Sequence, residues 1–175
     1  MMRKQLLLLC LLLLVLVGTG CQDLWFSSPQ QVLVGGVNSQ ATDQSPSYSG
    51  DGRYLAFASD RNQQRDIFLY DLQQKQLVNL PNLNRFDSLQ DQPALSGDGR
   101  FLVYVSTERG KSDILVYDRQ LERSQLLTAD IRGSVRQPTI TSDGRYVAYE
   151  TSNLGQWHIA LIDRGEKFAN PVPEK

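Results

Sequence analysis

The stretch "LSGDGRFLVYVS", residues Leu95–Ser106, has a close copy on each side of it. "YSGDGRYLAFAS" spans Tyr48–Ser59 and "ITSDGRYVAYET" spans Ile140–Thr151. A proline lies five residues before each Asp-Gly-Arg, and the segments "DIFLYD", "DILVYD" and "HIALID" begin fifteen residues after its Asp. A match at so many offsets indicates an internal repeat of 45 to 47 residues.

Each repeat predicts four short β-strands. In the second copy these are "PALS", "FLVYVS", "DILVYD" and "SQLLT", separated by polar turns and rich in β-branched and aromatic residues. The middle strands are apolar at successive positions, which predicts a sheet covered on both faces. We therefore predict an all-β fold, a β-propeller of about three four-stranded blades, with repeats at about 44–90, 91–135 and 136–170.

The units resemble the TolB-type propeller repeat over Gln44 to about Arg164. That pattern runs Pro, two variable residues, Ser-Pro-Asp-Gly, a hydrophobic strand, and later Asp-Ile with an apolar strand ending in Asp. This chain departs from it at two positions: the second Pro is replaced by Gly50, Gly97 and Ser142, and the third unit has His158 for Asp. The resemblance implies a six-bladed periplasmic propeller that contacts envelope proteins such as peptidoglycan-associated lipoproteins.

Three repeats are fewer than the roughly four to eight blades of a closed propeller. The third unit also lacks a fourth strand, because Pro171 and Pro173 follow "IALID" and proline cannot donate to a ladder. "QQVLVGG", which contains Val32–Val34, resembles the fourth strands and is predicted to complete the third blade. Dimerisation would then give a six-bladed ring, each N-terminal strand entering the partner's third blade. The alternatives are an open arc capped by another protein, or a shortened paralogue.

The N-terminal segment "MMRKQLLLLCLLLLVLVGTGC" has the layout of a secretory signal over residues 1–20: basic residues, an apolar run and small residues. The apolar run is shorter than the roughly 20 residues that span a bilayer. Its end, "VGTGC", resembles a bacterial lipobox, which implies lipidation of Cys21, a tether over 21–30 and a propeller domain over 31–175. An ordinary cleaved signal is the alternative. We expect an exported protein, lipid-anchored in the cell membrane or outer membrane and facing the periplasm or exterior.

The composition argues against a nucleic-acid partner and against a disulfide-stabilised domain. The 175 residues carry 18 basic and 19 acidic side chains, a net charge of -1 and no run of Lys or Arg, so we expect no nucleic-acid partner. The two cysteines, Cys10 and Cys21, lie within or next to the signal, which leaves the domain without a disulfide framework.

The recurring Asp-Gly-Arg allows a metal or a structural interpretation. Calcium takes about six to eight closely spaced oxygen ligands, whereas one Asp per blade would be too widely spaced. Asp-Gly between strands is a strong tight-turn pattern, because Gly accepts positive φ and Asp bonds nearby backbone amides. We therefore predict a structural repeat turn and no metal site. Its residues are Asp51, Gly52, Arg53, Asp98, Gly99, Arg100, Asp143, Gly144 and Arg145.

A second recurring set pairs a hydroxyl with a polar residue on the next strand: Ser59 with Asp66, Ser106 with Asp113, and Thr151 with His158. Repetition favours hydrogen-bond staples over proton transfer, and the turn arginines are candidates to pair with these carboxylates. His158 is the single histidine, and no G-x-S-x-G elbow is present. We therefore expect no enzyme activity, no catalytic residue and no cofactor.

Surface loops remain as candidate contacts. The polar loops Asp60–Arg65 and Thr107–Ser112 offer Arg61, Arg65, Arg109 and Lys111 to a partner. The predicted function is a membrane-anchored cell-envelope scaffold that binds envelope proteins and forms a homodimer. Two alternatives stay open, a small-ligand or carbohydrate-binding propeller and a non-catalytic accessory to an envelope hydrolase.

Overall fold

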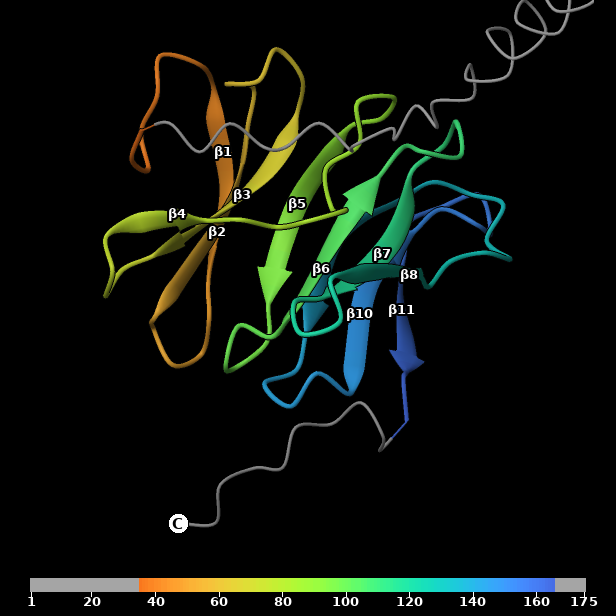
Figure 1. The fold of residues 1–175 in the computed structure, drawn as a ribbon. Coiled ribbons are helices and arrows are strands. Elements are labelled where there is room, and N and C mark those ends of the chain that lie inside the picture. The colour runs from red at the N-terminus through yellow and green to blue at the C-terminus, as the bar shows by residue number, and fades with distance from the viewer. Residues whose placement is uncertain (1–34, 166–175) are drawn as a thin grey trace, which may run out of the picture.

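The computed structural model describes residues 35–165. All regular secondary structure in this range is β-strand. The strands form three antiparallel sheets, here called blades 1 to 3 (Figure 1). Blade 1 contains β1 (Asp43–Tyr48), β2 (Tyr54–Ser59), β3 (Asp66–Asp71) and β4 (Gln76–Val78). Blade 2 contains β5 (Gln90–Leu95), β6 (Phe101–Ser106), β7 (Asp113–Asp118) and β8 (Arg123–Leu126), and blade 3 contains β9 (Val135–Ile140), β10 (Tyr146–Thr151) and β11 (His158–Asp163). The predicted all-β propeller architecture is confirmed.

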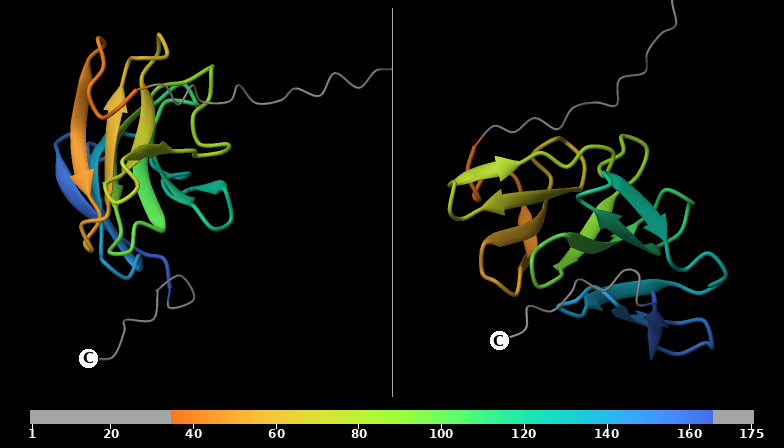
Figure 2. Two further views of the ribbon diagram at one scale, coloured as in Figure 1. Left: turned by 60° about the vertical axis from the view of Figure 1, so that its left-hand side comes forward. Right: turned by 60° about the horizontal axis from the view of Figure 1, so that its bottom comes forward.

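The blades stand side by side in an arc, with blade 2 between the other two (Figure 2). Their first strands are the inner ones, since β1 packs against β5 and β5 packs against β9. The Asp-Gly-Arg turns lie where β1, β5 and β9 end, which we call the turn end of the arc. The hairpin loops 60–65, 107–112 and 152–157 lie at the opposite end, the loop end.

Each inner strand carries a β-bulge just before its proline. The register shifts between Gln44 and Ser47 in β1, and at the equivalent places in β5 and β9. The residue before the proline has a left-handed backbone in all three blades: φ is 52° at Ser45, 52° at Gln92 and 50° at Gln137. A bulge leaves one residue unpaired, so the strand can contain a proline without losing a ladder hydrogen bond.

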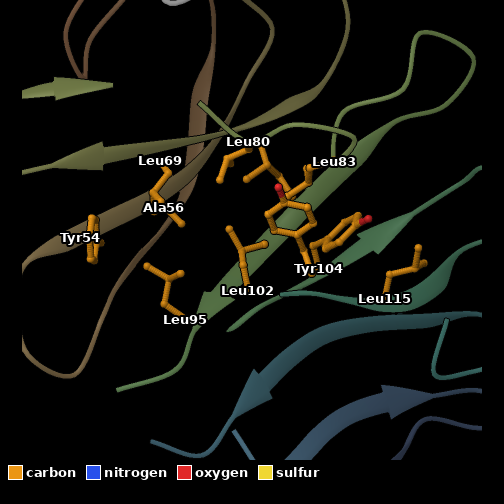
Figure 3. Packing of buried hydrophobic residues seen from close by; sticks show 11 residues of the cluster. Tyr54, Ala56, Leu69, Leu80, Leu83, Leu95, Leu102, Tyr104 and Leu115 are labelled. Atoms are coloured by element: carbon orange, nitrogen blue, oxygen red, sulfur yellow. The ribbon is translucent and has the colours of Figure 1, made fainter. Parts of the chain in front are cut away.

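Apolar side chains between the blades form the core. The largest cluster joins blades 1 and 2 and includes Ala56, Leu69, Leu102 and Tyr104 (Figure 3). A second cluster joins blades 2 and 3. Every residue of β2 and of β6 is buried, which confirms that the middle strands of blades 1 and 2 are covered on both faces.

Blade 3 differs from the other two. It has three strands within residues 35–165, and Ile159 and Leu161 of β11 are 70% and 74% exposed. Val32–Val34, predicted to complete this blade, lies outside the described residues, so ring completion stays a prediction. Between residues 35 and 165 no helix is long and apolar enough to cross a membrane.

Candidate functional site at the loop end

The three Asp-Gly-Arg turns share one hydrogen-bonding pattern. In blade 1, Asp51 Oδ1 accepts hydrogen bonds from Arg53 N at 2.9 Å and from Ser49 Oγ at 2.6 Å, while Ser49 Oγ accepts one from Tyr54 N at 2.9 Å. Blades 2 and 3 repeat these bonds through Asp98 and Asp143. The glycine that follows each Asp has φ between 68° and 79°. The aspartates therefore brace their own turns.

The arginine of each turn binds the last residue of the third strand. Arg53 donates to Asp71 from Nε at 3.1 Å and from Nη2 at 2.9 Å. Arg100 binds Asp118 and Arg145 binds Asp163 in the same way. The expectation that these arginines pair with Asp66 and Asp113 was wrong, because those aspartates begin the third strand and lie at the loop end.

These arginine clamps shift the pKa values of the carboxyl groups. The hydrogen bond from Arg145 lowers the pKa of Asp163 to about 2. Burial acts to raise the pKa of Asp118, but hydrogen bonds from Arg100 and from backbone amides outweigh it and lower the value. The same balance lowers the pKa of Asp71. Each carboxylate is thus held ionised in the folded chain.

Adjacent turns are stacked by backbone hydrogen bonds. Asp51 N donates to Gly97 O at 2.8 Å, and Gly97 N donates to Ser142 O at 2.8 Å. A Cβ on Gly97 would lie 2.0 Å from Ser142 Oγ, so a side chain has no room there. Proline at position 97 would also lack the N–H that joins blade 2 to blade 3.

Within residues 35–165, no group of three or more His, Cys, Asp or Glu side chains is placed to hold a metal ion. His158 lies at the loop end, exposed at the start of β11, where it pairs in register with Thr151.

The hydroxyl and acid pairs of blades 1 and 2 lie at the loop end. Ser59 is opposite Asp66, and Ser106 is opposite Asp113. Asp66 accepts hydrogen bonds from the amides of its own hairpin, at 2.9 Å from Asn62 and 2.8 Å from Gln64. Asp113 accepts one from Thr128 Oγ1 at 2.8 Å. Asp66 therefore holds the hairpin between β2 and β3, and Asp113 holds the connection that follows β8.

A pocket of about 480 Å³ opens between blades 1 and 2 at the loop end. Its walls come from the starts of β1 and β5, the hairpin loops of both blades and the end of β6. The lining residues are Gln44, Asp60, Arg65, Leu89, Asp91, Gln92, Val105, Thr107 and Ser112. The lining combines polar and charged groups with two apolar side chains, an arrangement that suits recognition of a polar group.

Arg65 organises this pocket. Its guanidinium binds both oxygens of Asp60, at 2.6 and 3.0 Å, and Nη1 donates to Gln44 Oε1 at 2.9 Å. Nη1 also lies 3.7 Å from Asp91 Oδ2 on blade 2. The hydrogen bond to Asp60 raises the pKa of Arg65. One cation therefore lies between two carboxylates from different blades.

The four predicted contact residues lie in different surroundings. Arg65 lines the pocket, whereas the Arg61 side chain is only 7% exposed. Arg61 donates to the carbonyl oxygens of Gly36 and Val37 and lies over the rings of Phe57 and Phe68. Arg61 therefore offers little surface to a partner.

Arg109 and Lys111 both face the buried carboxylate of Asp113. Arg109 Nη1 is 3.6 Å from Asp113 Oδ2, and Lys111 Nζ binds Asp113 Oδ1. Their side chains are 40% and 31% exposed, so they remain reachable from solvent.

Several residues at the loop end were not predicted from the sequence. Gln44, Asp91 and Gln92 reach the pocket from the inner strands, where the bulge displaces the backbone. Arg136 of β9 lies 3.9 Å from the ring centre of the half-exposed Trp157. The proline shared by the repeats was the one available hint of the bulge, and nothing in the sequence indicated which side chains it exposes.

The fold resembles that of several solved propellers. TolB from Acinetobacter baumannii aligns over 74% of this chain and 31% of its own, with a TM-score of 0.63 and 20% identity. A putative TolB from Agrobacterium tumefaciens aligns over 73% and 47%, with a TM-score of 0.58 and 18% identity. The chain thus spans less than half the length of either protein.

Enzymes also contain similar propellers. A puromycin-hydrolyzing peptidase from Mycobacterium tuberculosis aligns over 78% of this chain and 22% of its own, with a TM-score of 0.53 and 16% identity. No curated protein matches the chain. The sequence matches the family described as the TolB beta propeller domain over residues 13–175. The chain belongs to the TolB beta propeller domain family.

Proposed function

We propose that this chain is a protein-interaction scaffold of the cell envelope, anchored by a lipid on Cys21 and facing the periplasm or exterior. The observation that carries the proposal is the pocket at the loop end, which lies between blades 1 and 2 and is lined by Arg65, Asp60 and Asp91. The family supports a binding role. A rigid scaffold that presents loops of mixed charge suits recognition of another protein.

Site-specific photo-crosslinking tests this role. A photoreactive residue at Leu89, which lines the pocket and is 50% exposed, is expected to crosslink an envelope protein in living cells. The control position is Leu121, which is 52% exposed in the turn between β7 and β8. Equal crosslinking from both positions, or none from Leu89, would contradict a binding site at the pocket.

Anchoring has its own test. Cys21→Ser is expected to prevent incorporation of labelled palmitate and to move the protein from the membrane fraction to the soluble fraction. A Cys10→Ser variant should behave like the unchanged chain, because Cys10 lies within the predicted signal. Membrane retention of Cys21→Ser without acyl label would overturn lipid anchoring while leaving the scaffold role open to the crosslinking test.

A small-ligand site is the second candidate, and the size of the pocket favours it. The volume of about 480 Å³ falls in the range of about 300–1,000 Å³ typical of small-molecule pockets. Trp157 adds an exposed ring at the same end. Stabilisation by an oligosaccharide that is lost in Asp91→Ala would favour this candidate over the scaffold.

A further inference from the structure

The pocket between blades 1 and 2 contains a carboxylate with few partners of its own. Asp91 Oδ1 accepts a hydrogen bond from Gln92 N at 2.8 Å, and Asp91 Oδ2 lies 3.7 Å from Arg65 Nη1, which is beyond hydrogen-bond distance. Within residues 35–165, no side chain donates a hydrogen bond to Asp91. The Asp91 side chain is 34% exposed and lines the pocket, so a ligand can reach it.

The equivalent positions of the other two blades have their charge balanced by the chain itself. In blade 1 the residue is Gln44, which is neutral and accepts a hydrogen bond from an arginine at 2.9 Å. In blade 3 it is Arg136, whose Nε donates to Glu150 on the paired strand at 2.6 Å. Blade 2 has Val105 at the place of Glu150, in register with Asp91. The paired strand of blade 2 therefore offers Asp91 no opposite charge.

The charges that line the pocket favour a cationic ligand. Arg65 is the one basic side chain among the lining residues, and its Nε, Nη1 and Nη2 already donate to Asp60 or Gln44. Two carboxylates, those of Asp60 and Asp91, outnumber this guanidinium, so the net charge of the lining is negative. An anion would meet both carboxylates and a guanidinium that is already paired, whereas a cation would be attracted to Asp91.

The other lining residues suit the side chain of a lysine. Leu89 and Val105 present apolar surface against which a four-carbon stem can pack. Thr107 and Ser112 supply hydroxyl oxygens, and an ammonium group has three N–H donors to share between these oxygens and the carboxylate. Arginine fits less well, because a planar guanidinium pairs best with both oxygens of a carboxylate and Asp91 Oδ1 already accepts a backbone N–H.

We propose that the pocket binds the ammonium group of a lysine side chain on the partner protein, with Asp91 as its counter-charge. This lysine site rests on the proposed scaffold function and names the chemistry that the partner presents. The lysine stem packs against Leu89, and its ammonium group reaches Asp91 between the two blades. Because the ion pair is partly exposed, added salt weakens the binding.

The first test uses n-butylammonium, which is the lysine side chain without its backbone, and the full-length chain in an uncharged detergent. We expect saturable shifts of the Asp91 and Thr107 amide signals in NMR spectra. Binding should be at least about threefold tighter than that of n-butanol, which has the same stem without the charge. Asp91→Asn should remove this difference, because the amide keeps the shape of the side chain and loses its charge. Asp87→Asn is the matched control, since the Asp87 carboxylate is 45% exposed and lies outside the pocket lining.

The second test separates a lysine site from a site for anions. Arg65→Gln removes the cation beside Asp91 and should tighten the binding of n-butylammonium about twofold. Sodium butyrate should show no saturable binding to either chain. Butyrate binding that Arg65→Gln abolishes would overturn the proposal, and so would equal affinities of the unchanged chain for n-butylammonium and n-butanol.

Crosslinking at Leu89 distinguishes failure of the lysine site from failure of the scaffold function. A crosslinked envelope protein together with no binding of n-butylammonium would overturn the lysine site and leave the scaffold function in place. Binding of n-butylammonium that depends on Asp91, together with no crosslink, would support the site for an ammonium group and overturn the scaffold function.

Discussion

Blades 2 and 3 derive from the same repeat, yet they occupy different environments. Blade 2 is packed on both sides, and every residue of β6 and of β7 is buried. Blade 3 packs against blade 2 through Val147 and Tyr149, but β11 exposes Ile159 and Leu161. Equivalent residues thus have unequal surroundings. Contacts between blades therefore bury the apolar side chains of the repeat, and equivalent substitutions are predicted to have unequal effects.

The largest expected difference is between two leucines at the same repeat position, one buried and the other exposed. Leu69→Ala removes a side chain that is 0% exposed between blades 1 and 2, and it should lower the free energy of unfolding by about 2–5 kcal/mol. Leu161→Ala changes the equivalent residue of β11, which is 74% exposed, and should cost less than about 0.5 kcal/mol in dilute solution. Urea denaturation measures both. Equal losses would show that Leu161 is covered even in the isolated chain.

The stacked turns should give the next largest effect. Gly97→Ala places a methyl group 2.0 Å from Ser142 Oγ and 2.9 Å from Ser142 O, so we expect a loss of about 1–3 kcal/mol. Ser142→Gly in the same chain should recover part of it, because the Oγ contact disappears. Thermal denaturation of the single and double variants checks this. No recovery would mean that the turns are not in contact.

The arginine clamps should differ between the same two blades. Asp118→Asn in blade 2 leaves Arg100 without its charged partner and should cost about 1–3 kcal/mol. Asp163→Asn should cost much less than Asp118→Asn, because the Asp163 carboxylate is 45% exposed and solvent screens it. Adding salt should reduce the loss of stability caused by Asp163→Asn but not the loss caused by Asp118→Asn. A larger loss in blade 3 would contradict the assignment of blade 2 as the better-packed unit.

The smallest expected effect is a loss of stability at acidic pH, to which the arginine clamps of all three blades contribute. The pKa values of Asp71, Asp118 and Asp163 are lowered in the folded chain, to about 2 for Asp163. Unfolded Asp has a pKa near about 3.9, so the ionised clamps stabilise folding fully above about pH 4, and that contribution is lost as the pH falls toward about 2. Melting temperatures from pH 5 to pH 2 test this. A melting temperature that stays constant or rises over that range would rule out stabilising clamps.

The blades could be predicted from the sequence because comparison of the three repeats shows where each strand begins and ends. The apolar runs at β2, β6 and β7 and the Asp-Gly turns depend on local chemistry, so single segments were sufficient. The partners of the turn arginines were assigned to the wrong end of the third strand, because spacing alone does not say which end of a hairpin faces which turn. Arg119 and Arg164 were also missed, since their contacts with Tyr54 and Phe101 cross between blades.

The loop-end pocket was only partly predictable. Arg65 was named as a contact residue because it lies in a polar loop, and it does line the pocket. Asp91 and Gln92 could not be found, because a bulge in β5 sets their positions. Arg61 was named for the same reason as Arg65, but its cation lies against Phe57 and Phe68, a contact that depends on the path of the segment before β1.

Hydrogen–deuterium exchange resolved by strand tests the central claim most directly, namely that blade 3 repeats the packing surface of blade 2 but leaves it uncovered in the single chain. The account predicts slow exchange in β7, where every residue is buried, and much faster exchange in β11, which is the outer strand of blade 3 within residues 35–165. Exchange in β11 as slow as in β7 would contradict it, because Ile159 and Leu161 would then be covered within one molecule.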